Sequence, residues 1–270
     1  MLLAAALAAV AAADGGTAAP AVSWERLADG VELATLVLDP KPAFADGKLS
    51  VVRIDPARAQ LKFALASAEG EGRTAGDWAN AKGFVATINA GMFQTDHLSN
   101  VGLLVDGDHK NNGRWHPDYK SALAFGPKKK GIPAAVFVDL DAEGAKESLA
   151  DYASVVQNLR LLKAPASNVW KPNARKWSEA AIGADSRGRI LFLFSRSPME
   201  MHDWNERLRA LPLDVQRAMH VEGGPEASLS IRTKAKKLDL CGSYETRFLD
   251  NDGNTRQWPL PNVIGVVAKP

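Results

Sequence analysis

Short apolar segments separated by turn residues dominate this chain of 270 residues, and they constrain its fold more than any other feature. Residues 31–38, 49–55 and 61–66 run apolar or alternate with polar residues, as strands do. The segments between them are rich in proline, glycine and aspartate, which favour turns. A short helix is expected from Thr74, whose spacing to Asp77 resembles a capping box, to a glycine stop at position 83.

A second helix is predicted near residue 200. Ser197 and Glu200 have the spacing of a capping box, with proline between them at the first helical position. Met201, Trp204 and Leu208 then form an apolar stripe at helical spacing. Two helices among many hairpin-connected strands exclude a regular alternation of strand and helix. The sequence predicts an α+β fold of mixed, mainly antiparallel sheets with a few packed helices.

The composition describes a folded protein with little excess charge. Hydrophobic residues make up 46% and charged residues 24% of the chain, which is ordinary for a globular domain. The 33 basic residues nearly balance 31 acidic ones, for a net charge of +2. A nucleic acid or an acidic membrane surface as main partner would need a concentrated basic face. We therefore expect neither, and a single domain over residues 21–270.

The first 20 residues differ from the rest. About a dozen apolar residues are too few to span a bilayer, but they suit the apolar part of a secretory signal. We expect a signal-like leader and flexible stretch over residues 1–20, no stable membrane span, and a secreted or periplasmic protein. The basic start of such a signal is missing, since the first basic residue is Arg26, and an apolar tail is the alternative. The one cysteine, Cys241, is read as a small buried residue at a strand end.

The segment 220–228 carries the strongest functional signal. An apolar run ends at Glu222, and Gly223, Gly224 and a proline prevent the strand from continuing. Such a strand end presents polar groups over a pocket, and glycine lets a ligand approach the backbone. A hairpin turn with solvated carboxylates is the alternative. A second such constellation, Asn89 followed by Gly91, comes directly after an apolar segment over residues 84–88, which is also predicted as a strand.

Several other chemistries have no signature in the sequence. There is no Gly-x-Ser-x-Gly elbow, phosphate-binding glycine loop or dinucleotide fingerprint. The five histidines lack the helical spacing of metal ligands, and the His and Asp residues between positions 96 and 116 are more typical of solvated turns. We therefore expect no metal and no cofactor.

Three segments, in the same order, resemble the phosphodiester glycosidase family. They are residues 73–93, residues 156–158 with 180–183, and residues 222–228. The resemblance implies a hydrolase that cleaves a glycosidic bond in a sugar phosphodiester or a related glycan, with a carbohydrate or sugar phosphate as its substrate. The chain departs from the family pattern in three places: Glu222 replaces an aspartate, Glu179 follows Ser178 where an arginine is expected, and Asn158 replaces a small residue.

Read chemically, the resemblance gives each candidate residue a role. Glu222 is the central carboxylate, as nucleophile or base, because carboxylates stabilise or attack an oxocarbenium-like centre. Glu226 and Asp185 are candidates for a second carboxyl group. The candidate substrate contacts are the amides of Asn89, Gln157 and Asn158, the guanidinium groups of Arg160, Arg187 and Arg196 as phosphate clamps, the backbone at Gly91, Gly223 and Gly224, and Ser228.

Two other functions remain open from sequence alone. The Glu222 and Glu179 departures are also what a non-catalytic glycan- or partner-binding domain on the same scaffold would show. A metal-dependent phosphodiesterase would require ligands that only the group between residues 96 and 116 offers.

Overall fold

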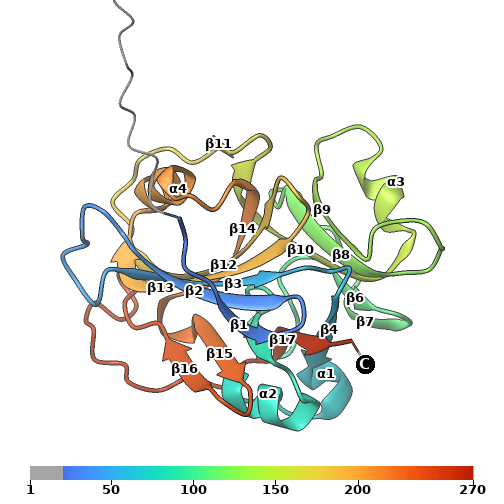
Figure 1. Cartoon of the computed structure of the whole chain (residues 1–270), viewed down its shortest axis with the longest axis horizontal. Helices are drawn as coiled ribbons and strands as arrows, with labels where there is room; N and C mark the ends of the chain where they lie inside the picture. The colour runs from blue at the N-terminus through green and yellow to red at the C-terminus, as the bar shows by residue number, and fades with distance from the viewer. Residues whose placement is uncertain (1–20, 270) are drawn as a thin grey trace, which may run out of the picture.

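Two antiparallel sheets lie face to face in the computed structural model, which describes residues 21–269 (Figure 1). The order along the larger sheet is β1 (Glu25–Ala28), β2 (Val31–Val37), β3 (Lys48–Ile54), β13 (Ile190–Met199), β12 (Trp177–Asp185), β14 (Val215–Gly223), β10 (Tyr152–Lys163), β6 (Leu104–Asp106) and β7 (His109–Asn112). Three more strands belong to this sheet: β11 (Ser167–Asn168) and β8 (Ser121–Pro127) pair with β10, and β9 (Ala135–Asp139) pairs with β8.

The smaller sheet has the order β16 (Lys237–Cys241), β15 (Ser228–Arg232), β5 (Ala86–Asn89), β17 (Asn262–Ala268) and β4 (Ala59–Leu65). Neighbouring strands of both sheets run antiparallel. Side chains from the facing surfaces of the two sheets form the main core, for example Val52 and Phe192 from the larger sheet and Ile88, Leu229 and Ile264 from the smaller one. This burial of apolar surface is the main force that holds the sheets together.

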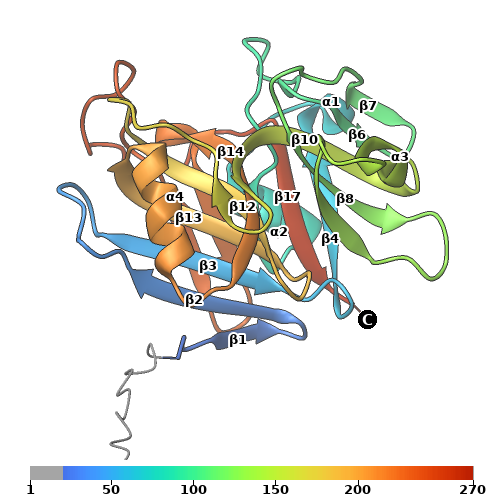
Figure 2. The ribbon, with the colours of Figure 1, turned by 90° about the horizontal axis from the view of Figure 1, so that it is seen from above.

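Helices cover the outer faces of both sheets. The helix α4 (Met201–Ala210) lies over the larger sheet (Figure 2), where Trp204 and Leu208 are buried against strand residues. The helix α2 (Ala75–Lys82) covers the smaller sheet through Trp78, near the short α1 (Ala66–Glu69). A further short helix, α3 (Ala145–Leu149), contributes Leu149 to a satellite core beside β8 and β10.

The prediction of α2 is confirmed. The Thr74 hydroxyl accepts a hydrogen bond from the backbone N of Asp77 at 3.1 Å, and Gly83 has a φ of 66°. The expected N-terminal cap of α4 is wrong by three residues, because β13 continues through Pro198 to Met199. The Ser197 hydroxyl instead accepts a hydrogen bond from the backbone N of Gly47 at 2.8 Å.

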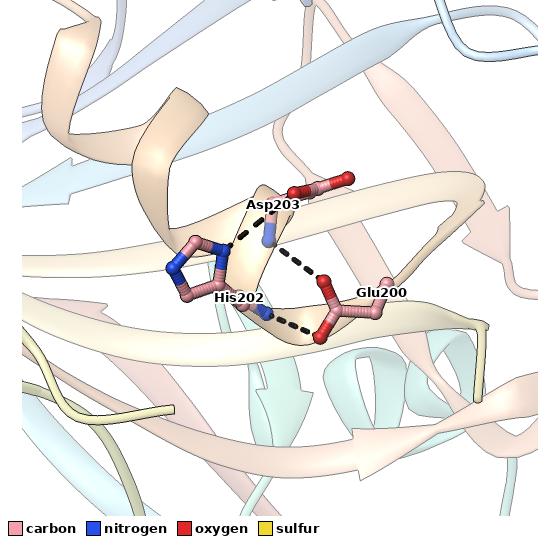
Figure 3. A group of neighbouring side chains, drawn as sticks. All are labelled: Glu200, His202 and Asp203. Atoms are coloured by element: carbon pink, nitrogen blue, oxygen red, sulfur yellow. Dashed lines mark hydrogen bonds and ion pairs between the residues drawn. The ribbon is translucent and has the colours of Figure 1, made fainter. Parts of the chain in front are cut away.

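Glu200 is the N-terminal cap of α4. Its carboxylate accepts hydrogen bonds from the backbone N of His202 at 3.1 Å and of Asp203 at 3.2 Å (Figure 3). These bonds satisfy two of the amide groups that a helix start leaves without partners. Glu200 also accepts a bond from the backbone N of Asn173 at 3.1 Å, so the loop 169–176 is fixed to the start of α4.

The fold is more dominated by strands than the α+β prediction implied. The antiparallel sheets are confirmed, but helices occupy only four short segments of the described chain, and η1 (Gly224–Glu226) adds one 3₁₀ turn. The helices α1 and α3 and the strand β17 were not predicted. The predicted leader, residues 1–20, lies outside the described residues, and the domain over 21–270 stays a prediction. Among residues 21–269, no helix is both long and apolar enough to cross a membrane.

Candidate active site

A β-bulge lies where β14 meets β12. Ala180 pairs with Glu222 and Ala181 pairs with His220, so Val221 has no partner of its own across the two strands. Such an extra residue bends the strand and changes the direction of nearby side chains, and bulges are common next to active sites. Both His220 and Glu222 line a cavity at this end of β14.

This cavity has a volume of about 620 Å³, and a second of about 340 Å³ adjoins it. We call the two together the acidic hollow. Met92, Glu222, Glu245 and Phe248 line both parts. The larger part is also lined by Trp170, Arg175, Trp177, His220, Gly223 and Arg247, and the smaller part by Phe93, Val101 and Glu226.

A buried acid–imidazole pair forms one wall of the hollow. The Nδ1 atom of His220 lies 2.8 and 2.9 Å from the two carboxyl oxygens of Glu179. The Nε1–H of Trp177 donates to the same carboxyl group at 2.7 Å, and the Trp177 ring meets the His220 ring edge-on at 6.0 Å. Glu179 has no exposed surface and His220 is 5% exposed. Trp177 contacts both members of the pair and so helps to fix the orientation of the Glu179 carboxyl group and the His220 ring.

Burial and charge act in opposite directions on this pair. Burial alone lowers the pKa of His220, but the charge and hydrogen bond of Glu179 outweigh it, and Glu222 and Glu245 add to a net rise. For Glu179, burial raises the pKa above its ordinary value, and His220 and Trp177 only partly oppose that rise. The imidazole is therefore biased toward its cationic form by the carboxylates around it.

The carboxyl groups at the hollow share a shift toward the protonated form. Burial raises the pKa of Glu222 to about 8, with His220 opposing and Glu226 assisting this rise. Burial raises the pKa of Glu226 to about 7, and it raises the pKa of Glu245 as well. Burial, and then the charge of Glu222, raises the pKa of Tyr119 to about 12. Shifts of this kind bring a carboxyl group close to the pH at which acid–base catalysis works best.

The two glycines after Glu222 are needed because side chains pack directly on them. A Cβ on Gly223 would lie 2.7 Å from Cδ1 of Trp177, and one on Gly224 would lie 2.6 Å from a carboxyl oxygen of Glu245. Gly224 also has a φ of 61°, which disfavours other residues. The Gly-Gly sequence thus allows the tryptophan wall and the Glu245 loop to close around the strand end.

The predicted amide side chains hold backbone segments in place and are not free to contact a substrate. Asn89 and Gln157 are buried, and their side chains bond to backbone groups: Asn89 to Glu226 and Ser228, Gln157 to Leu103, His116 and Tyr119. The Asn158 amide donates to the backbone O of Ala90 at 2.8 Å, and the Ser228 hydroxyl donates to the backbone O of Glu226 at 3.1 Å. Gly91 is buried between the side chains of Asn100 and Asn158.

None of Asn89, Gly91, Gln157, Asn158, Gly224 and Ser228 lines the hollow, so their predicted role as direct substrate contacts is wrong. Four other predicted residues do not line it either. Asp185 ends β12, six residues beyond Glu179 and so roughly 20 Å along the strand; it binds Arg189 at 2.6 Å. Arg187 lies in the turn after it, at a different cavity. Arg160 pairs with Asp141 at 2.8 Å, and Arg196 pairs with Asp252 at 2.7 Å. Asp185 and Arg187 lie at the far end of β12 and in the turn after it, while Arg160 on β10 and Arg196 on β13 are engaged by other partners.

Two other arginines lie at the hollow instead. Arg175 comes from the loop 169–176, and Arg247 from the segment that follows Glu245. Neither guanidinium makes a hydrogen bond or ion pair with another residue of the described chain. Arg247 has a φ of 72°, a strained conformation for a residue with a side chain, and strain of this kind often marks a functional site.

Sequence reasoning missed Glu179, His220, Glu245, Arg175 and Arg247. The signal for Glu179 and His220 was an ionisable residue inside an apolar strand, which is costly unless it is paired or used. The other three lie in polar loops, where nothing in the sequence separates them from surface residues.

Comparison with solved structures defines the fold. The catalytic domain of zebrafish N-acetylglucosamine-1-phosphodiester alpha-N-acetylglucosaminidase, auto-inhibited by its pro-peptide, is similar with a TM-score of 0.59 and 10% identity, over 96% of this chain and 87% of that one. A Synechocystis protein described as hypothetical has a TM-score of 0.59 and 14% identity, over 93% of this chain and 64% of that one.

Sequence comparison identifies the family. A profile of the phosphodiester glycosidase family matches residues 82–267, while no curated protein matches the sequence significantly. The chain belongs to the phosphodiester glycosidase family. The matched region, residues 82–267, contains all the residues named above as lining the hollow.

Proposed function

We propose that this protein is a hydrolase that removes a sugar from a sugar 1-phosphodiester, with Glu222 as its central carboxylate. The observation that carries the proposal is the position of Glu222, which borders both parts of the acidic hollow. A carboxyl group at this position is within reach of a substrate bound in either part. Family membership and the zebrafish enzyme's name support this substrate class.

The chemistry requires a carboxylate and a stabilised leaving group. Glu222 removes a proton from water as the water oxygen bonds to the anomeric carbon. The bond from that carbon to the phosphate oxygen breaks, and its electron pair leaves with the phosphate. The products are the free sugar and a phosphate monoester. The pKa of about 8 makes the ionised Glu222 a stronger base than an ordinary carboxylate.

The rim arginines supply charge for the phosphate. Arg175 and Arg247 line the larger part of the hollow, without competing carboxylate partners among residues 21–269. A guanidinium can bind two phosphate oxygens at once. Trp170 and Trp177 line the same part with their rings 6.0 Å apart. The hollow therefore offers an apolar wall for a sugar and cations for an anion.

The test is hydrolysis of a panel of sugar 1-(methyl phosphate) diesters, starting with N-acetylglucosamine, in ¹⁸O-labelled water. The proposal expects ¹⁸O on the sugar carbon, and no turnover by Glu222→Gln although the variant is folded and at least as stable as the wild type. Label on phosphorus would show a phosphodiesterase. Binding of the diesters without turnover by the wild type would show a glycan-binding domain.

A further inference from the structure

We infer that His220 donates a proton to the oxygen that leaves the anomeric carbon, and that Glu179 is a positioning residue acting through His220. This inference rests on the proposed function, because it names the proton donor of the same reaction. It concerns two side chains that the sequence analysis did not select.

The geometry leaves one end of the imidazole available. Nδ1 is used by Glu179 at 2.8 and 2.9 Å, whereas Nε2 has no hydrogen-bond partner among residues 21–269. His220 lines the larger part of the hollow together with Glu222, two residues away. A proton on Nε2 therefore faces the space where a substrate would lie, next to the proposed base.

The contacts of Glu179 fit an ionised carboxylate. It accepts from the Trp177 indole at 2.7 Å and lies against Nδ1 of His220 with both oxygens. With Nδ1–H donated to Glu179, any acid–base function of the ring falls to Nε2. A carboxylate behind an imidazole fixes its orientation and stabilises its cationic form.

The surrounding charges agree with this assignment. Glu222 on β14 and Glu245 on the loop after β16 both favour a cationic His220, while Glu179 faces it from β12. Arg175 and Arg247, the cations at the same part of the hollow, come from loops at its rim. Three carboxyl groups thus surround one imidazole, and an imidazolium beside Glu222 also favours the ionised form that the proposed base requires.

The proton transfer balances with the hydrolysis step. As the bond between the anomeric carbon and the leaving oxygen breaks, the Nε2 proton passes to that oxygen, and His220 becomes neutral. Glu222 has meanwhile gained a proton from the attacking water. Transfer of one proton from Glu222 to His220, directly or through water, restores the starting state.

A purely structural pair is the alternative. Removing one partner of a buried ion pair usually destabilises the fold, because it leaves the other charge buried without compensation. A structural pair would therefore be expected to affect unfolding but not the pH profile or the dependence on the leaving group. These two readouts separate the two roles.

The experiment compares Glu179→Gln and His220→Gln with Glu206→Gln, which neutralises a carboxylate on α4 outside the hollow. Three quantities are measured: the pKa of His220 by ¹⁵N NMR of the unliganded protein, kcat and KM across pH, and rates with substrates of graded leaving-group acidity. For Glu179→Gln we expect a lower His220 pKa, and a roughly 100-fold loss of kcat with little change in KM. The fall in activity at high pH should move to lower pH.

For His220→Gln we expect a loss that shrinks as the leaving group becomes more acidic, because a good leaving group needs no proton. Glu206→Gln should behave as the wild type in all three measurements. An unchanged His220 pKa in Glu179→Gln, or a loss in His220→Gln that is independent of the leaving group, would overturn the inference. Wild-type turnover with either result would leave the proposed function standing. If the wild type has no turnover, the proposed function and this proton-transfer role both fail, and the NMR titration still reports whether the pair exists.

Discussion

The side chain of Asn89 joins the two sequence motifs that first indicated a site. Its Oδ1 atom accepts a hydrogen bond from the backbone N of Ser228 at 2.8 Å, and its Nδ2 atom donates to the backbone O of Glu226 at 3.0 Å. The turn η1, which follows Glu222, is thereby fixed to the end of β5 in the smaller sheet. One buried amide thus positions the carboxylates of a site that it does not itself line.

Replacing Asn89 with alanine should therefore weaken both the fold and the site. Two backbone groups would lose their partners in a buried region, which costs about 1–3 kcal/mol. Urea unfolding measures this loss, and Asn80→Ala, at an exposed helical position, is the matched control. Asn89→Asp retains the acceptor for Ser228 but buries a carboxyl group against the Glu226 carbonyl, so it should also lose stability; an Asn89→Ala variant as stable as the wild type would show that the two bonds contribute nothing.

Gly91 should tolerate no side chain. A Cβ would lie 2.5 Å from the Oδ1 atoms of both Asn100 and Asn158, so Gly91→Ala requires these buried amides to move. We expect a loss of about 1–3 kcal/mol, as for other overpacked interiors. In Gly113→Ala, the nearest atom to the new Cβ is 3.8 Å away on a lysine side chain, so the melting temperature should barely change. Similar melting temperatures for the two variants would show that Gly91 is not needed for close packing against Asn100 and Asn158.

The rim arginines should control affinity for the anionic part of the substrate. Arg175→Ala and Arg247→Ala are each expected to raise KM roughly tenfold with a small effect on kcat, because they remove charge-assisted bonds to phosphate. Added salt should reduce the difference between wild type and variants. Arg187→Ala removes an equally exposed arginine at a different cavity. If it raises KM as much as the rim variants do, long-range charge and not direct contact explains the effect.

The sequence predicted the scaffold better than the site. Strands and the helix α2 have local signatures, namely apolar runs, Thr74 as a cap and Gly83 as a stop, and these are confirmed. The cap of α4 was misplaced because Ser197 has the right type and spacing, yet its hydroxyl is engaged by Gly47, 150 residues away. Spacing alone cannot reveal such a competitor.

The hollow depends on long-range pairing that no local pattern encodes. Glu179 and His220 meet only because β12 and β14 are neighbours with a bulge between positions 180 and 181. Asp185 is a carboxylate at a strand end, which is why the sequence suggested it as a second carboxyl group. It lies on the same strand as Glu179 but at the far end, beside a different cavity. The three arginine candidates also lie away from the hollow, because the sequence does not show which strands become neighbours or which way their side chains face.

Activity should rise with pH on the acidic side of its optimum. The proposed base must be ionised, and the pKa of Glu222 is about 8, so kcat/KM at pH 6 should be roughly a hundredth of its limiting value. A pH–rate profile between pH 5 and 9 measures this limb. Activity that is constant from pH 6 to 8, or that falls over this range, would exclude Glu222 as the base.

Stability should have the opposite pH dependence. The pKa of Glu222 is raised above its ordinary value of 4.5 to about 8, so between these two values the folded protein holds a proton that the unfolded chain releases. The contribution of Glu222 to the free energy of unfolding is therefore fully present below pH 4.5 and is lost as the pH rises toward 8. Glu222→Gln cannot ionise, so the variant should be more stable than the wild type at pH 8 by on the order of 1–2 kcal/mol, and this advantage should vanish near pH 4.5.

Urea titrations at pH 4.5, 6.5 and 8 test this difference. Glu206→Gln provides the control of opposite sign, because a hydrogen bond from Asn168 lowers the pKa of Glu206 and its neutral form should bring no gain at pH 8. A constant difference between Glu222→Gln and the wild type across this range would mean that Glu222 titrates as an ordinary surface carboxylate, and its assignment as a tuned base would then lose its physical support.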